Sequence, residues 1–213
     1  NNKKEMKHNP INIKEDIRIL KKSKKVDFLY IPKFKDVYNN NKKSNIKITK
    51  KNKILCAKFR KGHFEGVLDV MGRLTNLVNP KKIFMGKKDY QQYFLIKNYL
   101  KNKYKTSIIP CRTIRNKSKI ALSSRNNHLD LNGIKKASFL SKSLIELKRN
   151  LKNSKKIKQN LKIQMKYFEN FLKIKIEYLE LRSIKNLKIS NTVRGSRLFV
   201  AYYIDNVRLI DNF

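Results

Sequence analysis

Three short segments of this chain combine residue types that bind phosphates and sugars. The first, GKKDYQQ at 86–92, stands where an apolar run passes into a predicted helix. Gly86 permits close backbone approach, Lys88 offers a positive charge to a phosphate, and Asp89 can accept hydrogen bonds from ribose hydroxyls. Gln92 lies one turn beyond Lys88 and is expected to face the same cleft. Because a helix amino terminus attracts anions, phosphate is a natural ligand for this segment. An ordinary capped strand–helix junction uses the same residue types, and it is the favoured explanation when the segment is taken alone.

The second segment, ALSSRNNHL at 121–129, precedes another predicted helix. Ser123, Ser124 and Arg125 supply hydrogen-bond donors and a permanent positive charge, which suit the oxygens of a triphosphate. Loops rich in Ser and Asn also cap helices, so an ordinary N-cap explains this pattern equally well when it is taken alone.

The third segment, RKGHFEG at 60–66, holds His63 between two glycines at the start of a predicted helix. The imidazole changes its charge near neutral pH and can serve in a substrate pocket. A lone His is more often a surface or capping residue, so this segment by itself does not assign chemistry.

Alternating strands and helices are predicted to position these segments. A helix over 14–25 leads into an apolar strand over 26–32, and IKI at 46–48 indicates a short edge strand. Apolar residues at three-and-four spacing predict a helix between 64 and 79 that Pro80 ends and that buries the following stripe: Val67, Val70, Met71, Leu74, Leu77 and Val78. A strand ending at Gly86, a helix over 87–105 and a strand over 107–111 complete an α/β nucleotide-binding half.

The character of the chain changes after Arg112. A helix with Ala137, Leu140, Leu144, Leu147 and Leu151 in register precedes a second helix near 155–172. Alternating patterns at 174–181 and 197–204 predict strands, and Asp205-Asn206 predicts a hairpin into VRLID. We therefore expect two domains: a Rossmann-like half over 1–112, and a small α+β domain with an antiparallel sheet over 113–213.

The charge of the chain is extreme. Lys and Arg number 53 against 15 Asp and Glu, a formal net charge of +38. The excess is mostly Lys spread along the chain with Asn and Ile, as AT-rich codons would produce on a solvated surface, rather than the focused, Arg-rich charge of a nucleic-acid reader. No apolar run approaches the ~18 residues of a membrane span, and Cys56 and Cys111 are too isolated for a zinc site. These features predict a cytoplasmic protein with reduced thiols and with neither a membrane nor a specific nucleic acid as partner.

In combination the three segments resemble the pantothenate synthetase family. GHFEGV, LTNLVNPKKIFMGKKDYQQ and ALSSRN are similar in sequence and order to that family's GHFxGV, LFNLVxPDxAxFGEKDxQQ and LxxSSRN stretches. The similarity runs from 10–16 to the terminal VRLIDN. It implies a HIGH-type nucleotidylyltransferase fold and an ATP-dependent ligase that condenses pantoate with β-alanine through pantoyl adenylate, releasing AMP and pyrophosphate.

The resemblance also implies roles for individual residues. Lys88, Ser123 and Arg125 match groups that neutralise charge on the phosphates during catalysis, and Gln92 and His63 match pantoate-binding residues. The matched ATP-binding set is Gly86, Lys87, Lys88, Asp89, Ile114, Leu122, Ser123, Ser124 and Arg125. The resemblance implies Mg²⁺ on the triphosphate with no metal ligands from the protein, and a homodimer paired through the amino-terminal domain.

Several positions depart from the family pattern. Lys87 stands in place of Glu, Ser118-Lys119 in place of an Asp-Gly turn, and Cys56-Ala57 in place of a Glu-Gly pair. The family's His-x-Gly-His and Asn-Pro-x-Gln-Phe motifs would precede Asn1. Since one transition-state donor is worth about 10²–10³ in rate, we expect these 213 residues alone to be essentially inactive, and their sheet to have an unpaired strand edge.

Other functions remain open at this stage. Another nucleotidylyltransferase, such as a cytidylyltransferase, would share the phosphate-binding turns, but Gln92 and the SSRN loop disfavour it. A basic nucleic-acid-binding protein would bind DNA or RNA in a salt-sensitive way and would not respond to pantoate. A degenerate remnant would keep the fold without the chemistry.

Overall fold

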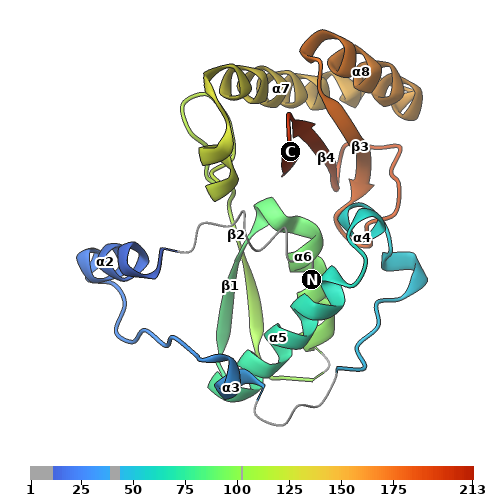
Figure 1. Ribbon diagram of the computed structural model, residues 1–213. Coiled ribbons are helices and arrows are strands. Elements are labelled where there is room, and N and C mark those ends of the chain that lie inside the picture. The colour runs from blue at the N-terminus through green and yellow to red at the C-terminus, as the bar shows by residue number, and fades with distance from the viewer. Residues whose placement is uncertain (1–11, 39–43, 102) are drawn as a thin grey trace.

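The computed structural model describes residues 12–38, 44–101 and 103–213. It has a parallel α/β part and a carboxyl-terminal part in which two long helices cover an antiparallel sheet (Figure 1). This architecture confirms the predicted fold class. No helix of the described residues is long and apolar enough to cross a membrane.

A strand–helix–strand unit lies at the centre of the α/β part. Strands β1 (Lys82–Gly86) and β2 (Ser107–Cys111) pair in parallel, with Gly86 opposite Cys111, and helix α6 (Tyr90–Lys101) connects them. Each of the two strands has an outer edge with no strand partner among the described residues. The predicted elements are confirmed, except that the helix begins with a separate 3₁₀ turn, η2 (Lys87–Asp89), and ends at Lys101 instead of 105.

Helix α5 (His63–Val78) is confirmed, but its predicted buried stripe is only partly right: Val67 and Met71 are partly buried against the core. The buried face consists of Phe64, Leu68, Gly72 and Thr75, whereas Leu77 and Val78 are about half exposed. A methyl group on Gly72 would lie 3.2 Å from the Tyr99 ring, so the small residues on this face let α5 pack closely against α6. The apolar residues that suggested the stripe lie beside that contact.

Two predicted strands are also wrong. Helix α2 (Ile13–Ser23) is present, but the residues over 26–32 are irregular, with Phe28 93% exposed. The IKI segment at 46–48 is extended without strand pairing, and Ile48 is buried in the core. Both segments have apolar sequences that suit a sheet, but no strand of the described residues lies alongside to accept their backbone hydrogen bonds.

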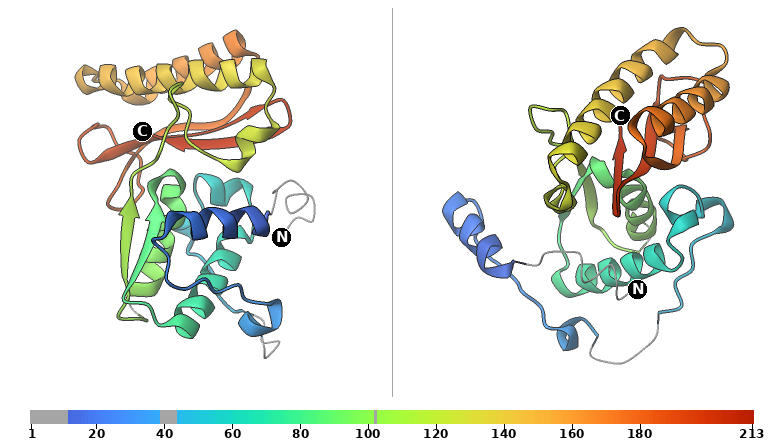
Figure 2. Two further views of the ribbon diagram at one scale, coloured as in Figure 1. Left: turned by 90° about the vertical axis from the view of Figure 1, so that its left-hand side faces the viewer. Right: turned by 45° about the horizontal axis from the view of Figure 1, so that its top comes forward.

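The carboxyl-terminal part follows the predicted order. Its elements are α7 (Leu131–Asn150), α8 (Ile157–Leu172), β3 (Lys175–Ser183), β4 (Ser196–Ile204) and β5 (Val207–Asn212). The sheet has the antiparallel order β3-β4-β5, and Ile204 pairs with Val207 across the predicted two-residue hairpin. Figure 2 shows α7 and α8 as an outer layer, the sheet beneath them, and the α/β part on the other side of the sheet.

Strand β4 is buried on both faces, which explains its nearly continuous apolar sequence. Leu198, Val200 and Tyr202 belong to the core under α7 and α8, while Phe199 and Ala201 belong to the core shared with the α/β part. This sheet therefore fixes the position of β5 relative to the β1–α6 junction. The candidate site lies between them.

The remaining short elements complete the chain path. They are the helices α3 (Phe34–Val37) and α4 (Cys56–Phe59) and the 3₁₀ turns η1 (Lys50–Asn52), η3 (Ser124–His128) and η4 (Leu151–Asn153). Of these, α4 leads into the His63 segment and η3 carries the SSRN loop.

Candidate active site

A cavity of about 240 Å³ lies where α5, the β1–α6 junction, the SSRN loop and β5 meet. Six of the sequence-predicted residues line it: His63, Lys88, Asp89, Gln92, Ser123 and Arg125. They come from three segments that are far apart in the sequence. We call this space the substrate cavity.

The 3₁₀ turn η2 aims Lys88 and Asp89 into the substrate cavity. Asn212 of β5 holds this turn, since its side-chain amide donates to the carbonyl oxygens of Lys87 at 2.9 Å and Lys88 at 2.7 Å. Lys88 Nζ lies 3.7 Å from Asp89 Oδ1, and the Lys88 side chain is 20% exposed. No atom lies within 4 Å of where a methyl group on Gly86 would stand, so a ligand can approach the backbone there.

Two adjacent glutamines on α6 have different surroundings. Gln91 is buried, and its amide donates to the carbonyl of Ile54 at 2.7 Å. Gln92 is half-buried and lines the substrate cavity, as predicted. Gln91 therefore anchors the loop before α4, while Gln92 is available to a ligand.

The SSRN loop reaches the substrate cavity from the carboxyl-terminal part. Ser123 caps η3, and its Oγ accepts from the backbone N–H of Arg125 at 3.3 Å. Arg125 Nη1 donates to the carbonyl of Arg208 at 3.0 Å. The capping role considered from the sequence is thus present, and it holds both side chains beside the cavity.

His63 contacts the guanidinium of Arg60 beside the cavity. Its Nε2 lies 2.7 Å from Nη1 of Arg60, which also lines the cavity. Because a guanidinium only donates, Nε2 is the acceptor in this contact. Sequence reasoning did not select Arg60, because a single Arg before a glycine turn carries no distinguishing pattern.

Arg208 of β5 is the other cation that sequence reasoning missed. Its guanidinium bonds Glu177 at 2.5 Å and lies 3.5 Å from Sγ of Cys56, which contacts the Tyr178 hydroxyl at 3.1 Å. Burial opposes the charge on Arg208, but the hydrogen bonds to Glu177 and Cys56 outweigh it and raise the pKa of this guanidinium. In the sequence, Arg208 is only one residue of an alternating strand.

The substrate cavity carries net positive charge. Arg60, Lys88, Arg125 and Arg208 line it against two carboxylates, Asp89 and Asp211. Asp211 is already held by Arg115, whose two terminal nitrogens lie 2.6 and 2.8 Å from its oxygens. Phosphates and carboxylates are therefore the ligands that suit this space.

The other five predicted residues do not line the substrate cavity. Ile114 and Leu122 are more than half exposed and lie side by side, with the Leu122 N–H donating to the Ile114 carbonyl at 3.0 Å. Lys87 lines a different cavity, and Gly86 and Ser124 flank the residues that do line this one.

The chain was compared with known proteins. The family model for pantoate-beta-alanine ligase matches residues 1–213. The pantothenate synthetase of Leptospira interrogans (serogroup Icterohaemorrhagiae serovar copenhageni) is 35% identical over 210 residues, which cover 95% of this chain and 72% of that protein. The enzyme of the same name from Caldicellulosiruptor saccharolyticus is 34% identical over 196 residues, covering 88% and 68%.

Solved structures give the same result. The pantothenate synthetase of Thermus thermophilus superposes with a TM-score of 0.82 at 26% identity, covering 96% of this chain and 75% of that one. The pantoate-beta-alanine ligase of Francisella tularensis, complexed with beta-gamma ATP and beta-alanine, superposes with a TM-score of 0.80 at 33% identity, covering 100% and 73%. Together with the match over residues 1–213, these similarities show that the chain belongs to the pantoate–β-alanine ligase family.

Proposed function

We propose that the substrate cavity is where this ATP-dependent ligase joins pantoate to β-alanine. The observation that carries the proposal is the convergence of Lys88, Gln92 and Arg125, with His63 and Ser123, on one positively charged cavity. The Francisella tularensis relative was solved with beta-gamma ATP and beta-alanine, which supports these two substrates here.

In the first step, a carboxylate oxygen of pantoate attacks the α-phosphorus of ATP. A new P–O bond forms, the bond to the β-phosphate oxygen breaks, and pyrophosphate leaves with the electron pair. Lys88, Ser123 and Arg125 are the groups we assign to the phosphate oxygens, because a fixed cation or donor offsets the charge that accumulates on them. No covalent bond to the enzyme is needed.

In the second step, the β-alanine amine attacks the acyl carbon of pantoyl adenylate. A C–N bond forms, the C–O bond to AMP breaks, and the amine releases its proton. We assign pantoate to Gln92 and His63: the Gln92 amide can donate to its carboxylate, and His63 is held at the rim by Arg60. Alignment of the two reactants is the main contribution expected of the protein.

The nucleoside part of ATP is assigned to the remaining predicted residues. Asp89 can accept from the ribose hydroxyls, and the open space beside Gly86 admits the nucleotide. The exposed backbone and apolar side chains of Ile114 and Leu122 offer a surface for adenine. Lys87 and Ser124 are also assigned to ATP binding, because they adjoin the proposed phosphate-binding residues Lys88, Ser123 and Arg125 in the sequence.

Mg²⁺ fits this site as part of the nucleotide. No group of three His, Cys, Asp or Glu side chains is placed to hold a metal within residues 12–38, 44–101 and 103–213. Mg²⁺ commonly keeps several waters and binds substrate phosphates, so triphosphate oxygens and water are sufficient ligands and Asp89 stays assigned to the ribose. The ion supplies further charge neutralisation on the phosphates when bound.

Two experiments test the proposed function. Calorimetric titration with Mg–ATP and with pantoate reports binding, and pantoate-dependent pyrophosphate release followed by β-alanine-dependent AMP formation reports the two steps. Arg125→Ala is expected to weaken Mg–ATP binding about tenfold or more, because a hydrogen bond to a charged group is worth about 1.5–3 kcal/mol. In a protein in which the His-x-Gly-His segment is joined upstream of Asn1, it is expected to lower turnover by about 10²-fold, since it removes one transition-state donor. Lys135→Ala, an exposed position on α7, is the matched control. Pyrophosphate release that needs no pantoate, or equal behaviour of the two variants, would reject the assignment.

We also propose a division into a nucleotide- and pantoate-binding domain over 1–112 and a lid domain over 113–213. The core under α7 and α8 consists only of residues after 113, which supports the boundary.

A cytoplasmic location is supported by the need for ATP and by the two free cysteines, Cys56 and Cys111, which suit a reducing compartment. The homodimer is proposed from the family resemblance, and its test is given below.

A further inference from the structure

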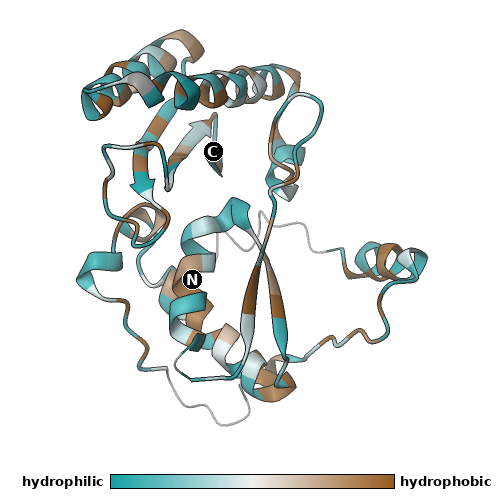
Figure 3. Ribbon diagram, turned by 180° about the vertical axis from the view of Figure 1, so that it is seen from behind, coloured by the Kyte–Doolittle hydropathy of each residue, from teal (hydrophilic) through white to brown (hydrophobic). Residues whose placement is uncertain are grey.

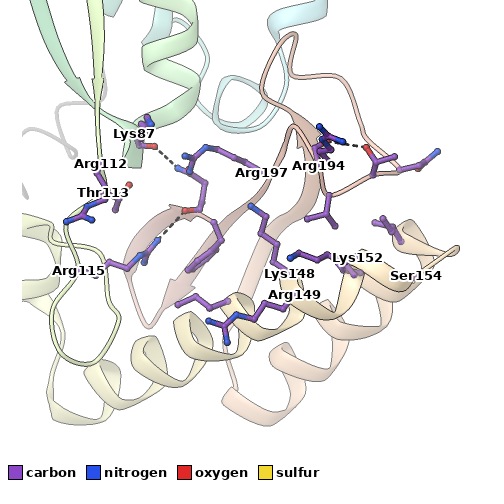
Figure 4. A pocket seen from close by; sticks show the side chains of 18 residues that line it. Lys87, Arg112, Thr113, Arg115, Lys148, Arg149, Lys152, Ser154, Arg194 and Arg197 are labelled. Carbon is purple, nitrogen blue, oxygen red and sulfur yellow. Dashed lines mark hydrogen bonds between the residues drawn. The ribbon is translucent and has the colours of Figure 1, made fainter.

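A second, larger cavity lies in the carboxyl-terminal part. It has a volume of about 1000 Å³, is open to solvent, and is bordered by the end of α7, the chain before β4, and the connection that follows β2 (Figure 4). It shares no lining residue with the substrate cavity. The neighbouring residues Lys87 and Lys88 line different cavities, Lys87 this one and Lys88 the substrate cavity.

This second cavity is lined by cations and by no Asp or Glu. Its charged residues are Lys87, Arg112, Arg115, Lys148, Arg149, Lys152, Arg194 and Arg197. Within the described residues, Arg115 is the only one of them in an ion pair with a carboxylate, that of Asp211. Burial, reinforced by Arg197 and Lys152, lowers the pKa of Lys148, as expected where like charges are crowded. We call this space the cationic cavity.

Neither surface drift nor the helix dipole explains the cationic cavity. Five of the chain's eleven arginines line it, although Lys is far commoner in this sequence. Cations at a helix carboxyl terminus offset its partial negative charge of about one half, which accounts for Lys148, Arg149 and Lys152 at most. Arg194 and Arg197 come from other segments, and Figure 4 shows Arg197 on the sheet across from Lys148 of α7.

We propose that the cationic cavity binds a small molecule with several phosphate groups, about the size of a nucleotide. Its volume is that of a small-molecule site, and Arg side chains match phosphate oxygens in pairs. Thr113 and Ser154 add hydroxyl donors, while Val193 and Phe213 offer apolar surface to an organic part. A concave space of this kind suits a compact ligand better than a nucleic-acid strand.

Calorimetric titration of the whole chain with inorganic tripolyphosphate tests the proposal. A Lys88→Ala background weakens phosphate binding in the substrate cavity, so the cationic cavity is measured separately from the proposed active site. In this background, binding is expected to persist, and Lys148→Gln and Arg197→Gln are each expected to weaken it about tenfold, the effect of one charged hydrogen bond. Lys135→Gln removes the same charge from an exposed position of α7 outside the cavity and should have little effect.

Three outcomes would overturn the proposal. One is loss of tripolyphosphate binding with Lys88→Ala alone, which would place all phosphate binding in the substrate cavity. Another is equal weakening by Lys148→Gln and Lys135→Gln, which would indicate diffuse attraction to a basic surface. The third is a 20-nucleotide RNA that binds more tightly than tripolyphosphate and whose binding is weakened equally by the cavity variants and by the control Lys135→Gln. Circular dichroism of each variant verifies folding, and agreement between Lys148→Gln and Arg197→Gln guards against a local defect in either.

Discussion

Lys88 is the residue on which the assignment of phosphate binding depends most directly. Lys88→Ala is expected to weaken Mg–ATP binding about tenfold or more, because a hydrogen bond to a charged group is worth about 1.5–3 kcal/mol. Calorimetric titration measures the change. Lys101→Ala removes the same charge from an exposed position at the end of α6 and serves as the control. An unchanged ATP affinity in Lys88→Ala would contradict the proposed role.

The buried ion pair of Arg208 and Glu177 gives a second prediction at this scale. Their side chains are only 10% and 7% exposed, so Glu177→Gln leaves a cation without its counter-charge in a buried position. We expect a loss of about 3–5 kcal/mol in the free energy of unfolding, measured by urea denaturation. The double variant Glu177→Gln/Arg208→Met should recover part of the loss, because it removes the uncompensated charge. Equal stability of single and double variants would argue against a charge effect.

Residue type and spacing predicted which segments meet at one cavity, but not the direction of each side chain. Lys87 and Lys88 are identical neighbours, and only the 3₁₀ turn sends one to each cavity. Arg60 and Arg208 were missed because their role depends on tertiary contacts with His63 and Glu177. A single basic residue in a turn or a strand gives no sequence signal of such contacts.

At the scale of elements, Asn212 connects β5 to the turn that carries Lys88. Its buried side chain donates to two carbonyls of η2 and accepts from Arg197 at 2.6 Å, so it also touches the cationic cavity. Asn212→Ala leaves these groups without partners, at a cost of about 1–3 kcal/mol in unfolding free energy. We expect a several-fold loss of Mg–ATP affinity, since the turn is no longer fixed.

Two measurements separate this local effect from a general loss of stability. ATP affinity is determined well below the thermal midpoint of the variant, and Asn132→Ala on the exposed start of α7 is compared in parallel. If Asn212→Ala lowers the midpoint but binds ATP as the parent protein does, then β5 stabilises the fold without positioning Lys88.

Helices and turns that are determined by residues close together in the sequence were predicted well. The helix at 131–150 and the hairpin at 205–206 follow from apolar spacing and turn residues. The strands expected at 26–32 and 46–48 were wrong, because an apolar alternating segment becomes a strand only beside a backbone partner. The buried stripe of α5 was only partly right, because Gly72 lies against Tyr99 of α6 and turns Leu77 and Val78 toward solvent.

At the scale of the whole molecule, the sheet β3-β4-β5 separates the two main hydrophobic cores and connects the two cavities. Asp211 and Asn212 at the end of β5 line the substrate cavity and the cationic cavity respectively. The basic side chains therefore fall into two groups. Most Lys side chains are solvated, while a small set, rich in Arg, lines the cationic cavity. Sequence composition alone cannot separate these two groups.

The last prediction concerns the proposed homodimer. Apolar side chains at 26–34 are exposed, with Phe28 at 93% and Phe34 at 73%, and Figure 3 shows α2 and this segment extending from the α/β part. Such a surface is expected to be covered in a stable assembly.

We expect the chain to sediment as a dimer at micromolar concentration. A two-fold interface buries one Phe28 from each copy, at about 2 kcal/mol per copy, so Phe28→Ser should raise the dissociation constant by about 10³-fold. The control Lys25→Ser introduces the same residue nearby without removing apolar area, and sedimentation equilibrium should show this variant to be dimeric. A monomeric parent chain, or equal dissociation of both variants, would contradict pairing through this segment.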